Sequence, residues 1–166
     1  MDAINRIPLA EVLRTANALQ TESFFEDYAI GGAIAAIFYV EPFATFDVDL
    51  FYIPINDALD AGIPAMFERL RQMGWTVEGE HLLCRGFPVQ FLSASKLTAE
   101  AVENAIDTEF DGVATKVFRP EYIVAIAAQV GRAKDHSRIA QMLDQADIDR
   151  VYLQAILDRY QLKLQI

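Results

Sequence analysis

Residues 45–53 read TFDVDLFYI and place Asp47 and Asp49 two positions apart in an apolar run. Apolar and charged residues alternate through this run, which predicts a β-strand over residues 45–53. Because side chains at positions i and i+2 of a strand share a face, the two carboxylates would be neighbours. Such a pair repels and resists desolvation, so the pattern is typical of a cation site or of a hydrogen-bonded pair.

The composition indicates one globular unit that does not bind nucleic acid broadly. The chain has 166 residues, of which 53% are hydrophobic, enough for a sizeable core. Its net charge of −10 argues against non-specific binding to nucleic acid, which relies on Lys and Arg. A small phosphorylated ligand, held by a few local cations and a metal, is not excluded.

Periodicity along the chain predicts an α+β fold. Helical spacing covers residues 8–26, 33–40, 57–73, 98–106 and most of the chain after Pro120, where Asp147 is the expected N-cap of the final helix. Strand-like runs cover residues 45–53, 75–77, 82–84, 87–92 and 113–118. This order lacks the regular alternation of a doubly wound fold. We expect an α+β core over 1–118, with C-terminal helices over 119–166 packed on the same unit.

A double glycine, Gly31-Gly32, precedes the predicted short helix. Glycines at such a place let the backbone approach a phosphate, and a helix N-terminus offers free N–H donors. A tight turn or close packing explains the pair equally well. The aspartates suit Mg²⁺ or Mn²⁺, because such cations are commonly bound by one or two carboxylates together with substrate phosphates.

The order of these features resembles the nucleotidyltransferase superfamily with its polymerase β-like fold. The features on which this resemblance rests are Gly31-Gly32, the short helix, and the Asp-x-Asp pair preceded by Thr45. The closer resemblance is to the small bacterial abortive-infection (AbiEii-like) nucleotidyltransferases, because residues 131–135 (GRAKD) followed by Arg138 look like that family's basic-acidic helical motif. The resemblance implies a mixed sheet flanked by helices.

The resemblance also implies roles for individual residues. Asp47 and Asp49 would hold the metal and take part in catalysis, and Asp135 would orient Lys134 or serve as a helper acid/base. The residues expected to contact the nucleotide and its phosphates are Gly31, Gly32, Thr45, Arg132 and Lys134.

One position departs from the family pattern. Active members place a third carboxylate on a later strand, and the matching strand here, residues 86–92, carries Gln90. An amide can offer its carbonyl oxygen to a metal but cannot act as an anionic base. Glu78, Glu80 and Asp135 are the candidates for replacing the missing acid.

Two main functions follow from these expectations. The first is metal-dependent transfer of a nucleoside monophosphate from a nucleoside triphosphate such as ATP to a hydroxyl of an RNA, a protein or a small molecule. The family resemblance alone implies a setting for it, a toxin–antitoxin-like or other bacterial system. The alternative is a catalytically degenerate module that binds a nucleotide or a protein partner, which includes a second copy of itself. A carboxylate-based metal phosphoesterase is a third reading, but it leaves the glycine pair without a role.

The sequence also predicts where the protein works. Cys84 is the single cysteine, so no intrachain disulfide is available, and the N-terminal residues lack the pattern of a signal peptide. No apolar run reaches the roughly 18 residues of a membrane span. We therefore expect a cytoplasmic protein without a membrane partner.

Overall fold

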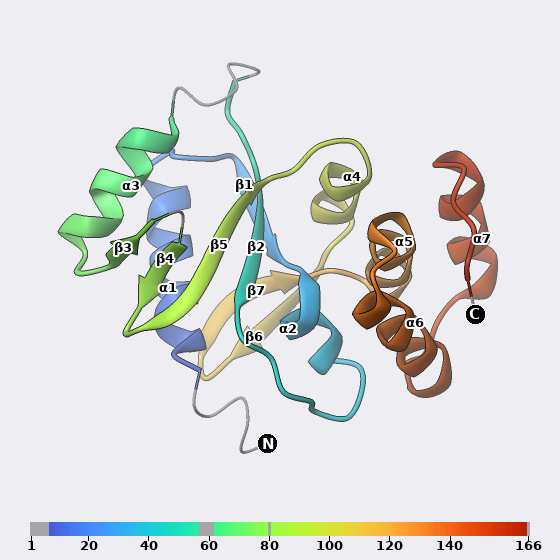
Figure 1. Ribbon diagram of the computed structural model, residues 1–166. Helices are drawn as coiled ribbons and strands as arrows, with labels where there is room; N and C mark the ends of the chain where they lie inside the picture. Colours follow the sequence, from blue (N-terminus) through green and yellow to red (C-terminus); the bar gives the residue numbers. More distant parts are fainter. Residues whose placement is uncertain (1–6, 57–61, 80, 166) are drawn as a thin grey trace.

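The computed structural model describes residues 7–56, 62–79 and 81–165. In chain order the elements are α1 (Leu9–Thr21), β1 (Asp27–Ile30), α2 (Gly32–Ile37), β2 (Val48–Ile53), α3 (Ile63–Gln72), β3 (Thr76–Glu78), β4 (His81–Cys84), β5 (Phe87–Ser93), α4 (Leu97–Glu103), β6 (Ile106–Phe110), β7 (Val113–Val117), α5 (Pro120–Val130), α6 (Ala133–Gln145) and α7 (Arg150–Arg159). The strands form one mixed sheet, with helices on both of its sides (Figure 1). The expected α+β class is confirmed.

The strand that carries the aspartates lies at the centre of the sheet. The strand order is β3-β4-β5-β2-β1-β7-β6. β2 pairs antiparallel with β1 and parallel with β5, and β1 pairs parallel with β7. Parallel neighbours require long connections, so α3, β3 and β4 lie between β2 and β5 in the chain.

The two faces of β2 meet different surroundings. Val48, Leu50 and Tyr52 are buried, whereas the alternate residues Asp49 and Phe51 are only partly covered. Figure 1 shows α1 and α3 on one side of the sheet and α5, α6 and α7 on the other. Asp49 and Phe51 share a cavity with residues of α5, so they face the side of the C-terminal helices.

The strand of the aspartates begins later than the sequence predicts. β2 starts at Val48 rather than Thr45, so Asp47 lies just before it. The reason is pairing, because the described ladder with β5 begins at Val48 and the ladder with β1 reaches only to Leu50. Thr45 instead donates a hydrogen bond from its hydroxyl to the carbonyl oxygen of Asp47, at 3.2 Å.

The predicted helix over 98–106 was wrong at its end. α4 stops at Glu103, and Ile106 begins β6. The strand was missed because its sequence, IDTEF, is polar, as suits a strand at the sheet edge. Asp111 and Gly112 join it to β7 with φ angles of 46° and 77°, and an Asp-Gly pair is a strong hairpin signal in a sequence.

β1 has no counterpart among the expected strands, and the remaining boundaries differ from expectation by a few residues. The helix expected over 8–26 is α1, which ends at Thr21, and that expected over 33–40 is α2, which ends at Ile37. The helix expected over 57–73 is α3, although residues 57–61 lie outside the described part. Cys84 is buried. Across the described ranges, no helix has both the length and the apolar character to cross a bilayer.

Asp149, and not Asp147, caps the final helix. Its carboxylate accepts hydrogen bonds from the backbone N–H groups of Val151 and Tyr152, both at 3.0 Å. Asp147 was the expected cap, but Asp149 is the residue that stands directly before the first turn of α7. Its own N–H donates to the carboxylate of Glu121 at 2.9 Å, which joins α7 to α5.

Loss of this cap should destabilise the protein measurably. We expect Asp149→Ala to lower the free energy of unfolding by about 1 kcal/mol, the usual value of an N-cap. The matched control is Asp147→Ala, which should change it by less than about 0.5 kcal/mol, as for an ordinary surface position. Urea unfolding of both variants checks this, and equal losses would contradict the assignment.

Candidate functional site

A cavity of about 340 Å³ lies between the sheet and the C-terminal helices. Its floor comes from β2 and β5, its far wall from α5, and one end from the start of α6. The lining residues come from both parts of the chain, 1–118 and 119–166: Gly32, Ala33, Asp47, Asp49, Phe51, Gln90, Leu92, Thr98, Phe118, Ile123, Ile126, Ala127, Gln129, Val130, Arg132, Lys134, Asp135 and Arg138. The cavity therefore has a charged end and an apolar end.

Both glycines of the pair are required by close packing against the site. Gly32 has a φ of +59°, and a Cβ built on it would overlap the carboxylate of Asp49. A Cβ on Gly31 would lie 2.5 Å from the ring of Phe51 and 2.8 Å from that of Phe118. The N–H of Gly31 also donates to the backbone carbonyl oxygen of Asp49 at 2.9 Å. Close packing thus explains the pair, and contact of a phosphate with these glycines stays a prediction.

Asp49 is an unusually weakly acidic carboxyl group. Burial raises its pKa, the nearby charge of Asp47 raises it further, and Arg138, Lys134 and Arg132 lower it, leaving a pKa of about 6. A cation between the two aspartates would favour the ionised form. Even with these three cations nearby, the surroundings favour the protonated form of Asp49 more than water does.

Gln90 lies directly beside Asp49. The two residues are partners in the parallel register of β2 and β5, and both line the cavity. The amide thus occupies the position next to the aspartate pair at which the resemblance expects a third carboxylate. Within the described residues, no group of three or more His, Cys, Asp or Glu side chains could hold a metal ion.

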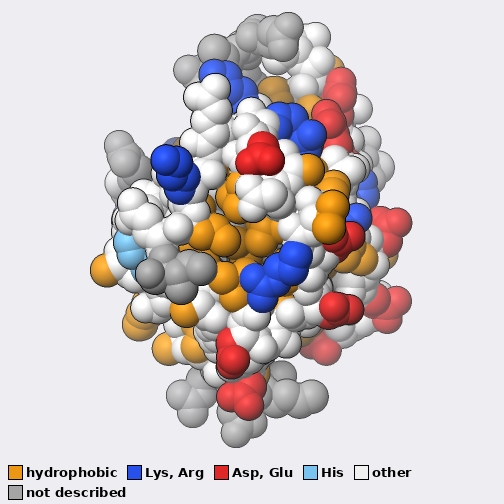
Figure 2. Space-filling model, turned by 90° about the vertical axis from the view of Figure 1, so that its right-hand side faces the viewer, with side chains coloured by type: hydrophobic (Ala, Val, Ile, Leu, Met, Phe, Trp, Pro, Cys, Tyr) orange, Lys and Arg blue, Asp and Glu red, His pale blue; other side chains and the backbone are white. Residues whose placement is uncertain are grey.

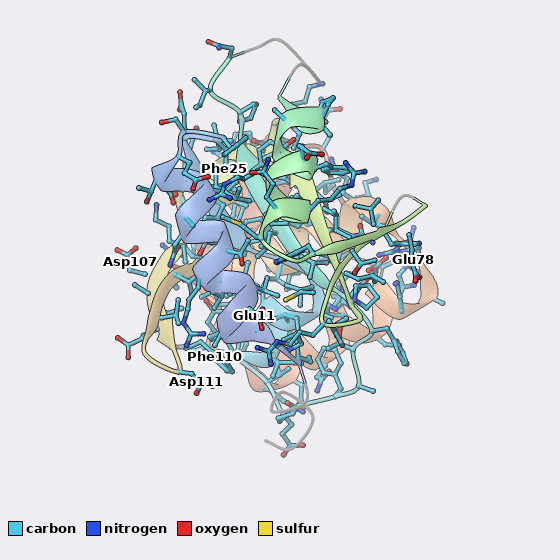
Figure 3. All side chains as sticks on the ribbon, turned by 90° about the vertical axis from the view of Figure 1, so that its left-hand side faces the viewer. Glu11, Phe25, Glu78, Asp107, Phe110 and Asp111 are labelled. Atoms are coloured by element: carbon cyan, nitrogen blue, oxygen red, sulfur yellow. The ribbon has the colours of Figure 1, made fainter. Side chains whose placement is uncertain are left out.

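The candidate replacement acids lie elsewhere or are engaged. Glu78 is on β3, two strands from β5, and Figure 3 shows it at the opposite edge of the sheet from Asp107 and Asp111. Glu80 lies outside the described residues. Asp135 does line the cavity, but it is 1% exposed and bound to arginines.

The expected basic cluster stands at the charged end of the cavity. Gly131, with φ +69°, ends α5, and α6 begins two residues later. The carboxylate of Asp135 accepts hydrogen bonds from the backbone N–H of Arg132 at 3.1 Å and from its Nε at 2.7 Å. Lys134 lines the same cavity and is exposed. Asp135 therefore orients Arg132, whereas no bond between it and Lys134 is present among the described contacts.

Sequence reasoning gave no role to Arg138. It lines the cavity, and its Nη1 lies 3.5 Å from Asp135. Its spacing of three residues from Asp135 places both on one face of α6, which is the signal that could have found it. Thr45, by contrast, is not among the described lining residues of the cavity.

The charges at this end balance. Asp47, Asp49 and Asp135 face the cations of Arg132, Lys134 and Arg138. Oxygen ligands from two carboxylates, with an amide oxygen beside them, fit Mg²⁺ when phosphates complete its coordination. The cations can neutralise phosphate oxygens. The lining thus combines oxygen atoms of the kind that bind cations with cationic groups of the kind that bind anions.

Solved structures with a nucleotidyltransferase-like fold resemble this chain along most of its length. An antigenic nucleotidyltransferase-like protein from Paracoccidioides brasiliensis has a TM-score of 0.58 at 16% sequence identity, covering 96% of this chain and 87% of that one. The solution structure of the antibiotic-resistance factor ANT(2'')-Ia has a TM-score of 0.56 at 14% sequence identity, and the match covers 92% of this chain and 91% of that one. The crystal structure of ANT(2")-Ia in complex with adenylyl-2"-tobramycin has a TM-score of 0.55 at 13% sequence identity, and the match covers 92% of this chain and 97% of that one.

The comparisons establish the fold. No family model matches the sequence, and no curated protein matches it significantly. At these identities the structural likeness shows that the chain has a nucleotidyltransferase-like fold, as the order of its motifs predicts.

Proposed function

We propose that this protein transfers a nucleoside monophosphate from a nucleoside triphosphate to a hydroxyl acceptor. The main observation in support of this proposal is that the aspartate pair, Gly32 and three cationic side chains line one cavity. The fold shared with nucleotidyltransferases supports the proposal. A place in the AbiEii-like branch belongs to it as well, supported by the sequence of residues 131–135.

In this proposal each part of the cavity has a separate task. Asp47 and Asp49 hold Mg²⁺ or Mn²⁺, which when bound supplies positive charge to the reacting phosphoryl group. Arg132 and Lys134 bind phosphate oxygens, and Gly32 leaves room beside the carboxylates. The acceptor oxygen bonds to the α-phosphorus, and pyrophosphate leaves with the electron pair of the broken bond. The acceptor's proton passes to water, because Gln90 cannot take it, and we therefore expect slow turnover.

Calorimetry tests the binding half of the proposal. Each of ATP, GTP, CTP and UTP is titrated with and without Mg²⁺ into the wild-type protein, Asp47→Asn and the exposed control Asp144→Asn. We expect tight binding that requires Mg²⁺, is lost in Asp47→Asn and is kept in Asp144→Asn. Binding that is equally tight in Asp47→Asn, or absent from the wild type, would contradict the metal site.

A labelled-triphosphate assay tests the chemical half. The acceptors supplied are RNA, protein and small hydroxyl compounds, among them an aminoglycoside because ANT(2'')-Ia is seen with adenylyl-tobramycin. Transfer of label to any acceptor supports the proposal. No transfer, with binding intact, favours the second candidate.

The second candidate is a binding module of the same fold. The observation in its favour is Gln90, which stands in register with Asp49 where an acid would complete the site. Such a module could also bind a protein or a second copy of itself through the C-terminal helices. Figure 2 shows hydrophobic side chains gathered among charged ones on that side, and Val151 of α7 is 82% exposed.

Placing a carboxylate at position 90 tests whether this residue contacts the metal. We expect Gln90→Glu to increase the affinity for Mg²⁺ and ATP and the rate of transfer about tenfold each, because a charge-assisted contact contributes roughly 1.5–3 kcal/mol. Gln90→Leu, which removes the ligand atom, is the matched control and should weaken metal binding. Unchanged affinity and rate in both variants would show that residue 90 does not contact the metal.

A further inference from the structure

We propose that Arg138 binds the pyrophosphate portion of the nucleotide, and that Asp135 is the positioning residue that holds Arg138 and Arg132 for this contact. The inference rests on the function proposed above and assigns a role to two residues of the same cavity. It replaces an acid/base role for Asp135 with an orienting one.

Arg138 has a donor that lacks an acceptor. Its side chain is only 15% exposed and lines the charged end of the cavity. Its Nε is buried and has no hydrogen-bond partner within the described part of the chain. A buried N–H of a charged group is costly to leave unpaired. Arg138 as a residue lines the cavity, and a phosphate oxygen there is the kind of acceptor that a guanidinium with unused donor capacity fits.

Arg138 shares the cavity with the aspartate pair. Asp47, Asp49 and Arg138 all line it, and the Nη1 of Arg138 lies 3.5 Å from the carboxylate of Asp135. A polyphosphate that fills this cavity therefore meets both the aspartates and Arg138.

The carboxylate of Asp135 is fully engaged by arginines. Oδ2 accepts from the N–H and Nε of Arg132, and Oδ1 lies 3.3 Å from Nη2 of Arg132 and 3.5 Å from Nη1 of Arg138. Burial acts to raise the pKa of Asp135, but these hydrogen bonds and charges lower it below its ordinary value. Asp135 thus stays anionic with both oxygens occupied, as a positioning residue requires.

Inorganic pyrophosphate with Mg²⁺ is the probe that isolates this contact. We expect Arg138→Gln to weaken its binding roughly tenfold to a hundredfold, the range for a hydrogen bond to a charged group. Arg138→Lys keeps the charge but lacks the planar fork, so it should recover only part of the affinity. The control Arg71→Gln removes a half-exposed arginine on α3 and should leave binding unchanged.

The direction in which Asp135→Asn changes the affinity for pyrophosphate tests the role of Asp135. If its charge only repelled the ligand, the substitution would strengthen binding. If Asp135 positions Arg132 and Arg138, the substitution removes their ionic partner, and we expect the affinity to fall by about tenfold or more. The side-chain Nε–H signal of Arg138, followed by NMR during the titration, should shift in the wild type, and a melting curve shows that each variant is folded.

The outcomes distinguish this inference from the function on which it rests. If ATP binding requires Asp47 while folded Arg138→Gln binds pyrophosphate normally, only the inference is overturned. Tighter binding of pyrophosphate by Asp135→Asn overturns the positioning role. If the wild type binds neither ATP nor pyrophosphate, the proposed function itself falls.

Discussion

Asp49→Asn should stabilise the ligand-free protein at neutral pH and abolish the metal-dependent activity that is proposed above. Burial first, and then Asp47, raises the pKa of Asp49 from 3.8 to about 6 in the folded state. The folded wild-type protein must therefore ionise a group that resists ionisation. This difference corresponds to about 2–3 kcal/mol, which asparagine would avoid because it has no charge to bury.

The pH dependence fixes the sign of this effect. A carboxyl group whose pKa is raised by folding favours the folded state below the unfolded pKa, and that contribution is lost as pH rises through the folded value. We therefore expect Asp49→Asn to exceed the wild type in unfolding free energy at pH 7.5 and to converge with it between pH 6 and pH 4. Urea unfolding in a chelator at several pH values measures this. A constant difference at all pH values would mean that Asp49 does not titrate abnormally.

The same variant should lose at least a hundredfold in Mg²⁺-dependent nucleotide binding or transfer, because a metal ligand carries several kcal/mol. Greater stability with lost activity is the usual trade at functional sites. Wild-type activity in Asp49→Asn would remove the aspartate from the proposed metal site.

Gly32→Ala should be the most disruptive conservative change near the site. Two costs add at this position. The left-handed φ of +59° disfavours any side chain by about 1–2 kcal/mol, and the new Cβ overlaps the carboxylate of Asp49, an overpacking cost of about 1–3 kcal/mol. We expect a total loss of about 3 kcal/mol in unfolding free energy and loss of metal binding, measured by urea unfolding and calorimetry.

Gly86→Ala is the matched control for this substitution. Gly86 has a φ of +79°, and a Cβ there would meet nothing within 4 Å. It should therefore show the backbone cost alone, about 1–2 kcal/mol. In addition, Asp49→Ala should cost less in the Gly32→Ala background than in the wild type, because it removes the overlap. Equal losses for Gly32→Ala and Gly86→Ala would contradict the close contact with Asp49.

The order of motifs was enough to predict the fold class, because local signals and tertiary structure agree at those points. The alternation around Asp49 corresponds to a strand at the centre of the sheet. β6 was missed because its polar sequence suits the edge of a sheet, where burial does not select hydrophobic residues. Its presence was still signalled by Asp111 and Gly112.

The charged end of the cavity was only partly predictable for a different reason. Asp135 was expected to act together with Lys134. In the structure, its carboxylate contacts Arg132 and Arg138 instead. Sequence spacing places residues on a helix face without saying which neighbours pair. Likewise, the parallel register that brings Gln90 beside Asp49 depends on a crossover between strands distant in the chain.

The register of Gln90 with Asp49 has an evolutionary consequence. In the genetic code, a glutamine codon becomes a glutamate codon when its first base changes from C to G. A set of three carboxylates is therefore one point mutation away from the present site. A single base change at this codon therefore alters the charge beside Asp49, while the register of β2 with β5 needs no change.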